Sequence, residues 1–285
     1  MSDIIPETIK LIDTRYKNKN SFSGIPSGFT DLDSMTSGFQ NSEMIIIGAR
    51  PSMGKTALAL SMIQNIAIER KIPCGFFSLE MSRLQIGQRL LSQVARVQGT
   101  KLRNGMLKIE DFKKLQDAGG ECYDAPLYIV DVPNMKLLDL RAMARRMRVN
   151  QKVEIIFIDY IGLITSENTD APVYEQQSAI SKSLKSLARE LDIPIVVLCQ
   201  VARTAEGNEP GLAELRGSGS IEQDADMVMF IHGDRNKNKS SNEGYDPVQD
   251  RKLIVAKQRN GPIGDVDVLF LSSYTKFENK SKERE

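Results

Sequence analysis

The sequence has almost no net charge and few cysteines, and each scarcity excludes a class of protein. Its 38 lysines and arginines against 37 acidic residues leave a formal net charge of +1. No global basic field therefore indicates nucleic-acid binding, and any such contact must come from local placement of Lys and Arg. The three cysteines, Cys74, Cys122 and Cys199, lack the spacing of metal or redox motifs. Two of them fall in apolar runs, which is typical of buried thiols in a reducing cytoplasm.

Long apolar stretches and internal repeats are also missing. The longest apolar stretch, residues 155–164, is interrupted by Asp159, so we expect no membrane span and a cytoplasmic protein. What is present is an ordinary globular composition of 285 residues, 41% hydrophobic and 26% charged. That length can bury the core of one large domain or of two small ones.

The chain is organised around residues 44–58, MIIIGARPSMGKTAL. An apolar run enters a Gly/Pro-rich turn, and Gly54 then precedes a segment of good helix formers. Such a strand, loop and helix direct backbone N–H groups and a helix N-terminus at phosphate groups. Lys55 can then reach the β- and γ-phosphates, and the Thr56 hydroxyl can bind Mg²⁺. The alternative is a chance Gly-Lys-Thr in a surface loop, which the surrounding pattern disfavours.

The phosphate loop departs in one place from the strict motif G-x-x-x-x-G-K-[ST]. That motif needs glycine at position 49, where this chain has alanine, with glycine one position earlier. The residues expected to contact the nucleotide are Gly48, Ala49, Arg50, Pro51, Ser52, Met53, Gly54, Lys55, Thr56 and Ala57.

Apolar strands and amphipathic helices alternate along most of the chain. Strands are predicted at 44–47, 73–79, 127–131, 153–159, 193–199, 225–231, 251–257 and 265–271. Helices are predicted at 3–16, 56–70, 82–97, 137–150 and 174–191. This alternation predicts an α/β fold, a mostly parallel twisted sheet with helices on both faces, and the last two strands form a C-terminal β-hairpin. In the helix 82–97 we expect Leu84, Leu90, Leu91 and Val94 to face inward, and we expect the polar residues 234–250 to form a loop.

Three polar residues close predicted strands, at the edge where parallel sheets bind ligands. Asp159 closes IIFID and suits an acid that holds Mg²⁺ beside Thr56, although a turn-capping role is the alternative. Glu80 closes FFSLE and could orient the water that attacks a γ-phosphate, or form a salt bridge at the sheet edge. Gln200 closes VVLCQ and could hydrogen-bond the γ-phosphate, or be a solvated loop residue.

Two cations, Lys257 and Arg259, lie two positions apart on a predicted strand, so their side chains should face the same way. Because neighbouring cations repel, we expect them to meet an external anion, such as the triphosphate of a neighbouring subunit. An arginine there stabilises the transition-state charge of phosphoryl transfer. The alternative is a solvated edge strand, where lysine is common.

The glycine-rich segment 203–220 follows the strand that Gln200 closes. Arg216, Gly217 and Gly219 offer a cation and exposed backbone N–H groups, which can follow a nucleic-acid backbone without reading bases. We expect these three residues to contact DNA, and a plain surface loop is the alternative.

Taken together, these motifs resemble the helicase domain of DnaB-type replicative DNA helicases, which are RecA-like ATPases. The resemblance runs from residue 23 to 277 and includes alanine at position 49. It rests on GIPSGFTDLD, GARPSMGKTALAL, FFSLEMS, IIFIDYIGLI, LARELDIPIVVLCQ, LRGSGSIEQDAD and IVAKQRNGPIG, in that order. We accordingly expect a linker helix and linker at 1–22, a RecA-like ATPase domain at 23–278 and a polar tail at 279–285.

The resemblance implies homo-hexameric rings that use ATP and Mg²⁺ to move 5′-to-3′ on single-stranded DNA and separate the duplex. Nucleotide sites would lie at the subunit interfaces, and a helicase loader and primase are possible partners. The helix 3–16 would pack on the adjacent subunit. The family's N-terminal collar domain, which engages primase, has no counterpart among these residues.

The resemblance also implies roles for individual residues. Glu80 would be the catalytic base, Asp159 the Walker B acid and Gln200 the γ-phosphate sensor. Lys257 and Arg259 would reach the next subunit's site. It adds Arg89, nine residues after Glu80, as an arginine near the nucleotide, and it makes 216–219 the pore loop that contacts DNA.

Two positions depart from the family pattern, and two other functions are compatible with the same motifs. Gly217 stands where the family often has an acid, and Gly233 stands where an arginine is usual. One alternative function is a RecA-like recombinase that forms open filaments, and the other is a non-catalytic nucleotide-binding adaptor. The joint presence of Glu80, Asp159 and Gln200 disfavours the adaptor.

Overall fold

The computed structural model describes residues 1, 5–6, 8–9, 13, 22–201, 209–215, 219–233 and 247–281. The helix expected at 3–16 therefore lies largely outside the described residues, although the five that are described within it are helical. No helix within the described ranges is long and apolar enough to cross a membrane.

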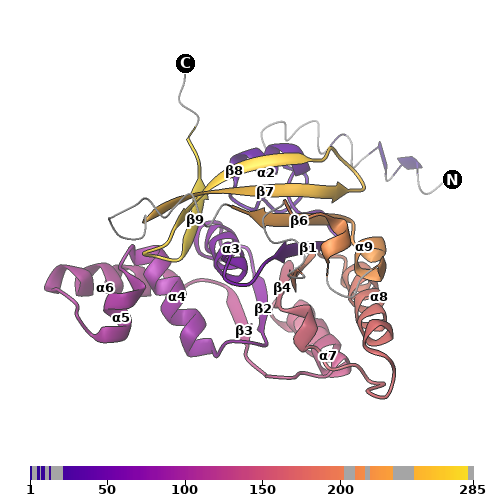
Figure 1. Ribbon diagram of the computed structural model, residues 1–285, viewed down its shortest axis with the longest axis horizontal. Helices are drawn as coiled ribbons and strands as arrows, with labels where there is room; N and C mark the ends of the chain where they lie inside the picture. Colours follow the sequence, from indigo (N-terminus) through magenta and orange to yellow (C-terminus); the bar gives the residue numbers. More distant parts are fainter. Residues whose placement is uncertain are drawn as a thin grey trace.

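The described strands form one nine-stranded sheet in the order β3-β2-β4-β5-β1-β6-β7-β8-β9 (Figure 1). The first six in that order are parallel, and the last three are antiparallel. Their bounds are β1 Met44–Ala49, β2 Cys74–Ser78, β3 Leu127–Val130, β4 Ile155–Asp159, β5 Ile195–Gln200, β6 Met227–His232, β7 Val248–Gln258, β8 Gly264–Leu271 and β9 Lys276–Asn279. The predicted α/β class, the mostly parallel sheet and the β7–β8 hairpin are confirmed.

Two predictions about strands were wrong. Eight strands were expected, but a ninth, β9, follows a short turn after β8 and pairs with it. It was missed because it is four residues long and alternates charged and apolar side chains only once. Residues 248–250, expected to belong to a polar loop, are the start of β7, where they pair with the end of β8.

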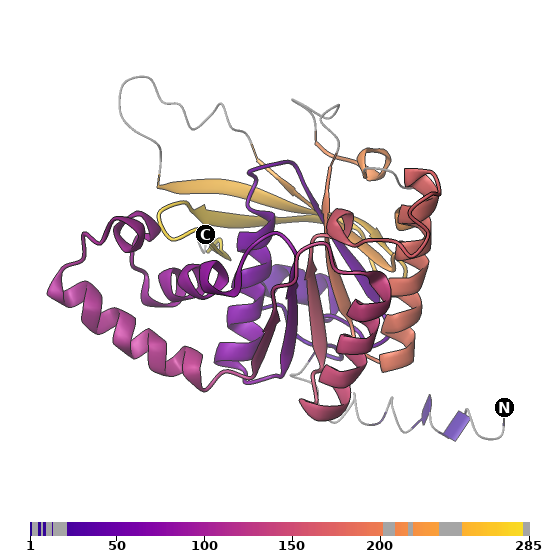
Figure 2. The same ribbon diagram turned by 90° about the horizontal axis from the view of Figure 1, so that it is seen from below.

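Helices cover both faces of the sheet (Figures 1 and 2). One face packs α3 (Lys55–Ile63, continued by a π-helical turn Gln64–Glu69), α4 and α2, and the other packs α7, α8 and α9. The remaining bounds are α2 Thr30–Thr36, α4 Arg83–Ala95, α5 Gly99–Asn104, α6 Ile109–Tyr123, α7 Leu137–Asn150, α8 Val173–Leu191 and α9 Gly219–Asp224. The helices α5 and α6 extend beyond the sheet at the β3 side (Figure 2).

The central strand β1 shows why this sheet is buried on both sides. All six of its residues are buried. Ile45 and Ile47 belong to the core on the α3 face, whereas Met44 and Ile46 belong to the core on the α8 face. Successive side chains of a strand point to opposite faces, so an unbroken apolar run packs against the helices on both faces of the sheet.

The inward face of α4 differs from the prediction at one residue. Leu90 is buried and Leu91 and Val94 are half-buried, as expected, but Leu84 is 81% exposed. Ile86 is fully buried in its place. Since residues four apart share a helix face, Ile86 and Leu90 define the stripe, and Leu84 falls off it.

A buried carboxylate fixes the segment that precedes β1. Asp33 is 2% exposed and accepts hydrogen bonds from the Ser27 N–H and hydroxyl, both at 2.7 Å, and from the Gly28 N–H at 3.0 Å. Burial raises the pKa of Asp33, and the bonds from Ser27 and Gly28 oppose that rise. Gly28 itself has φ +89° and lies against Asn65, so no side chain fits there.

We predict that Asp33→Ala lowers the free energy of unfolding by roughly 2–4 kcal/mol, because three donors lose their acceptor. Urea denaturation measures the difference. The matched control is Ser34→Ala on the same helix, an exposed position where the change should stay within about 0.5 kcal/mol. Equal effects of the two substitutions would contradict the role given to Asp33.

Candidate nucleotide-binding site

A cavity of about 490 Å³ lies at the carboxyl ends of β1, β2, β4 and β5. This is the edge of a parallel sheet at which ligands are expected to bind. Eleven of the residues predicted to form the site line it: Ala49, Arg50, Pro51, Ser52, Gly54, Lys55, Thr56, Ala57, Glu80, Arg89 and Gln200.

The loop after β1 leaves the N-terminus of α3 open for an anion. Gly54 is the N-cap of α3 and has φ +94°, which only glycine adopts without strain. It has no side chain to bond the first N–H groups of the helix, and these groups attract phosphate. Phe277 of β9 packs against Gly54, where an added Cβ would lie 2.9 Å from the ring, and its N–H donates to the Ser61 hydroxyl of α3 at 2.9 Å.

Lys55 and Thr56 line this cavity and contact Asp159, which adjoins the cavity without lining it, although β4 and α3 are far apart in the sequence. The Thr56 hydroxyl donates to Asp159 Oδ2 at 2.6 Å, and Lys55 Nζ lies 3.3 Å from Asp159 Oδ1. Asp159 is fully buried. Lys55 Nζ also lies 4.1 Å from the centroid of the Tyr160 ring, a cation–π distance. The carboxylate therefore sits where a cation is already favoured.

The same residues fit a magnesium ion. Asp159 Oδ1 is buried and accepts no hydrogen bond from the described residues. Mg²⁺ takes oxygen ligands and is usually held by one or two protein groups together with water and phosphate oxygens. The described residues contain no cluster of three or more His, Cys, Asp or Glu, so these two oxygen groups suit a metal that arrives with phosphate.

Glu80, Gln200 and Arg89 surround that centre. Glu80 is exposed, two residues beyond the end of β2, and Gln200 is paired in register with Ala49. Burial lowers the pKa of Arg89, while the charges of Asp159 and Glu80 act to raise it. Arg89 is thus close enough to both acids to feel their charge, as expected for an arginine beside an anion site.

Two residues of the predicted loop do not line the cavity. Gly48 lies within β1, where a Cβ would come 2.6 Å from the Phe230 ring, so this glycine permits close packing with β6. The Met53 side chain is buried in the core on the α3 face. Gly48 and Met53 therefore contribute to the packing beneath the phosphate loop and do not line the cavity.

Three lining residues were not predicted: Tyr160, Phe270 and Thr275. Tyr160 directly follows the predicted acid Asp159, and that adjacency could have identified it. Phe270 comes from β8, a predicted strand, and Thr275 comes from the turn into β9, the strand that sequence patterns missed.

The cavity lies at the carboxyl ends of the parallel strands, whereas Lys257 and Arg259 lie near their amino ends. The Arg259 N–H donates to the carbonyl of Asp226, whose own N–H donates to the carbonyl of Met44. Met44 is the first residue of β1, whereas the phosphate loop follows the last. Both cations are therefore remote from the nucleotide cavity of their own chain.

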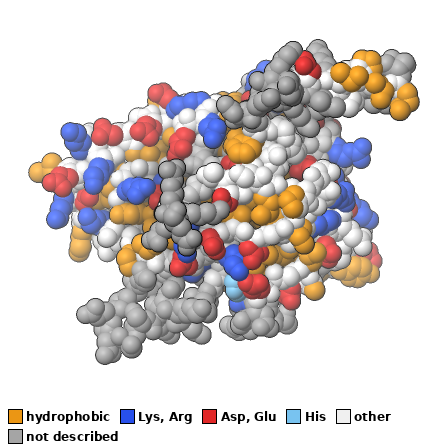
Figure 3. All heavy atoms as spheres, turned by 90° about the horizontal axis from the view of Figure 1, so that it is seen from above, with side chains coloured by type: hydrophobic (Ala, Val, Ile, Leu, Met, Phe, Trp, Pro, Cys, Tyr) orange, Lys and Arg blue, Asp and Glu red, His pale blue; other side chains and the backbone are white. Residues whose placement is uncertain are grey.

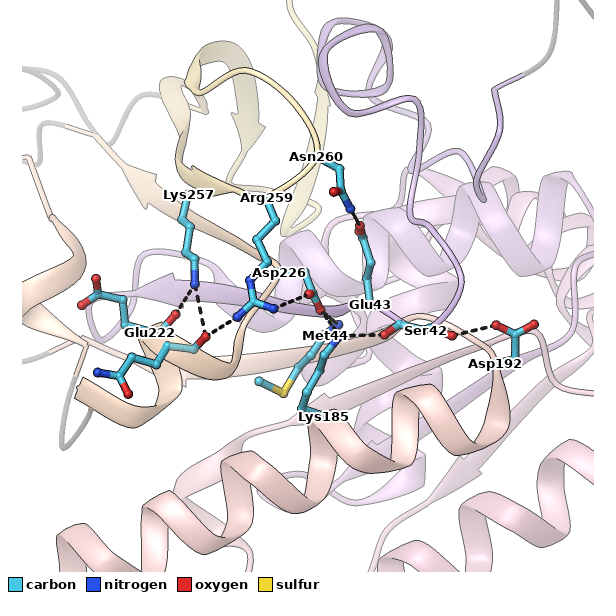
Figure 4. A network of polar contacts seen from close by, with 11 residues as sticks. Ser42, Glu43, Met44, Lys185, Asp192, Glu222, Asp226, Lys257, Arg259 and Asn260 are labelled. Carbon is cyan, nitrogen blue, oxygen red and sulfur yellow. Dashed lines mark hydrogen bonds and ion pairs between the residues drawn. The ribbon is translucent and has the colours of Figure 1, made fainter. Parts of the chain in front are cut away.

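The two cations do face the same way, but they are already partnered. Lys257 Nζ donates to the Glu222 carbonyl at 2.5 Å, and Arg259 donates to the Gln223 carbonyl at 2.5 Å and to Asp226 Oδ1 at 3.3 Å (Figure 4). The expectation that both stand on a strand was wrong for Arg259, which follows the last residue of β7. An anion does lie near them, and it belongs to the same chain.

Of the residues expected to contact DNA, only Gly219 is described, as the first residue of α9. Arg216 and Gly217 lie outside the described residues. The preceding Leu215 forms an isolated antiparallel bridge with Val201, just after β5. Val201 and Leu215 thus both lie near the carboxyl end of β5, which borders the cavity.

Comparison with known proteins agrees with this geometry. A model of the family described as the DnaB-like helicase C terminal domain matches residues 24–279. The replicative DNA helicase DnaB of Treponema pallidum is 59% identical over 281 residues, which are 99% of this chain and 62% of that protein. The chain thus spans less than two thirds of the length of this relative.

Solved structures give the same result. A DnaB-like replicative helicase, described with its interactions with primase, superposes with a TM-score of 0.87 at 32% identity, over 96% of this chain and 66% of that one. A solved ATPase domain superposes with a TM-score of 0.89 at 32% identity, over 98% of this chain and 99% of that one. The fold is RecA-like, and the chain belongs to the DnaB-like helicase C-terminal domain family.

Proposed function

We propose that this chain is the ATP-hydrolysing motor of a replicative DNA helicase, which moves 5′-to-3′ along single-stranded DNA and separates the duplex. The observation that carries the proposal is that Lys55 and Thr56, which line a cavity of nucleotide size, both contact the buried Asp159 beside it. Family membership and the names of the similar helicases support it.

The residues of the cavity divide the work of phosphoryl transfer among them. Lys55 neutralises the β- and γ-phosphates, and the N-terminus of α3 binds them through backbone N–H groups. Thr56 and Asp159 would hold Mg²⁺, which would offset charge on the phosphate oxygens. Glu80 accepts a proton from the attacking water, and Gln200 and Arg89 contact the γ-phosphate region.

We propose that a second copy of the chain completes the nucleotide-binding site. Lys257 and Arg259 lie at the edge of the sheet remote from their own cavity, so they can stabilise transferring phosphate only in a neighbour. A contact between two different surfaces of the same chain is heterologous and closes into a ring when the rotation allows. A homo-hexamer is the proposed ring.

The remaining partners follow from the family. Single-stranded DNA would contact Arg216, Gly217 and Gly219, and primase is suggested by the helicase solved with it. A helicase loader is a further proposed partner. The face in Figure 3 mixes positive and negative side chains, so DNA binding is proposed to be local to that loop. We place the motor domain at 23–278, between the linker segment 1–22 and the tail 279–285, in the cytoplasm.

A recombinase that forms open filaments is the second candidate, because it would share the same cavity. Particle images with ATP and single-stranded DNA separate the two, since closed rings support the helicase and helical filaments the recombinase. DNA-stimulated ATP hydrolysis with strand separation by the chain would establish the motor. Nucleotide binding without hydrolysis would instead indicate an adaptor.

We predict that Glu80→Gln lowers the rate of ATP hydrolysis about a hundredfold or more, because proton acceptance contributes that much in general base catalysis. Nucleotide affinity, measured by fluorescence titration, should change little. The control Glu110→Gln lies at an exposed position on α6 and should hydrolyse ATP at the wild-type rate. An active Glu80→Gln protein would remove Glu80 from the mechanism.

We predict that Lys55→Ala and Arg259→Ala are each inactive alone but regain ATP hydrolysis when mixed. In the mixture, an intact phosphate loop of one variant meets the intact arginine of the other at about one interface in four, because the interface is heterologous. The measurement is the rate of phosphate release against mixing ratio. Full activity of Arg259→Ala alone would contradict an arginine supplied by the neighbour.

A further inference from the structure

The two oxygens of Asp226 have different partners. Oδ2 accepts from the Met44 N–H at 2.8 Å and from Lys185 Nζ at 2.6 Å, whereas Oδ1 lies 3.3 Å from the Arg259 guanidinium (Figure 4). The residue is 6% exposed. Its backbone is also fixed between β1 and the end of β7. The carboxylate is therefore immobile, and Arg259 holds only one of its oxygens, at the longest of the three distances.

Departure of Arg259 would not leave a bare buried charge. Lys185 and the Met44 N–H would still compensate Asp226 through Oδ2, so the usual penalty for breaking a buried ion pair is reduced. The Arg259 side chain is 46% exposed and can swing out without opening the core. The contact is thus built so that the arginine can leave and return.

Lys257 and Arg259 also contact the helix α9. The carbonyls of Glu222 and Gln223, in the last turn of α9, accept from Lys257 and Arg259. Cations near a helix C-terminus stabilise its unpaired carbonyls. The other end of this six-residue helix is Gly219, where the loop proposed to contact DNA ends. Withdrawal of the two cations would remove the partners of one end of α9 while the other end adjoins the DNA loop.

We propose that Asp226 is a positioning residue that docks Arg259 within its own chain. Arg259 then exchanges between Asp226 and the γ-phosphate of the neighbouring copy, and each exchange removes or restores the partners of the last turn of α9, the helix whose first residue, Gly219, is proposed to contact DNA. The proposal rests on the proposed function, because it needs the neighbour's nucleotide. A guanidinium cannot occupy both places, so nucleotide and Asp226 compete for it.

The alternative is that Asp226 only holds the fold together through Met44 and Lys185. The geometry of Arg259 favours an exchangeable contact over a purely structural one, because its side chain is 46% exposed and lies 3.3 Å from a single oxygen of Asp226. Burial and the charge of Arg259 lower the pKa of Lys257, while Glu222, Asp226 and Asp224 act to raise it.

The first test is Asp226→Asn in the full chain, with ATP hydrolysis measured with and without saturating single-stranded DNA. Asparagine keeps the shape but loses the charge that holds Arg259. We expect hydrolysis without DNA to rise about three- to tenfold and KM for ATP to fall, with little change in kcat at saturating DNA, because the docked state is weakened. Stimulation by DNA should fall by the same factor, and Asp226→Glu should restore much of it.

The matched control is Glu43→Gln. Glu43 is buried to a similar degree and neighbours Met44, but among the described residues its carboxylate accepts a hydrogen bond from Asn260 and forms no ion pair with Arg259. Its DNA stimulation should equal that of the wild type. Unchanged stimulation in Asp226→Asn, or an equal fall in Glu43→Gln, would overturn the proposal.

A second measurement does not require Asp226 to be replaced. Ser220, the second residue of α9, is partly exposed, so Ser220→Cys can carry a fluorophore at the start of this helix. A non-hydrolysable ATP analogue should change its emission in otherwise wild-type rings and not in rings that also carry Arg259→Ala. No emission change in active rings overturns the proposal, whereas an active Arg259→Ala protein overturns the proposed function itself.

Discussion

The contact of Asp159 with Thr56 and Lys55 depends on the order of strands more than on any other feature. Strand β5 lies between β4 and β1, so the acid that ends β4 reaches across one strand to the helix that follows β1. Parallel pairing brings all their carboxyl ends to one edge. A fully buried carboxylate at that edge is tolerable because an ammonium and a hydroxyl compensate it. The whole cavity is arranged around this compensated charge.

The parallel sheet also separates the two halves of the proposed reaction. The phosphate loop lies at the carboxyl ends of the parallel strands, and Asp226 and Arg259 lie at their amino ends. A single chain cannot bring these ends together, because a sheet is rigid between them. Assembly is therefore required by geometry in the function we propose, and the amino ends become the surface that a neighbour's nucleotide would meet.

Local sequence patterns predicted what is local and missed what is set by tertiary packing. Eight strands, the phosphate loop and the polar residues that end strands were predictable, because apolar runs and a glycine-rich turn are read over a few residues. β9 and the adjoining Thr275 were not, since a four-residue strand has too little periodicity, and no local pattern shows that Phe270 of the predicted strand β8 lines the cavity. Leu84 was assigned inward because helical spacing alone does not fix where the buried stripe begins. Likewise, no local pattern places Asp226 beside Arg259.

The strand that sequence patterns missed has a consequence for how the protein is made. Phe277 of β9 packs on Gly54 of the phosphate loop and binds Ser61, a residue 216 positions earlier. A growing chain releases its N-terminal residues from the ribosome first. The phosphate loop therefore lacks this packing partner until β9, which comes much later in the chain, has been synthesised. Loss of β9 would accordingly affect the phosphate loop, although the two are far apart in the sequence.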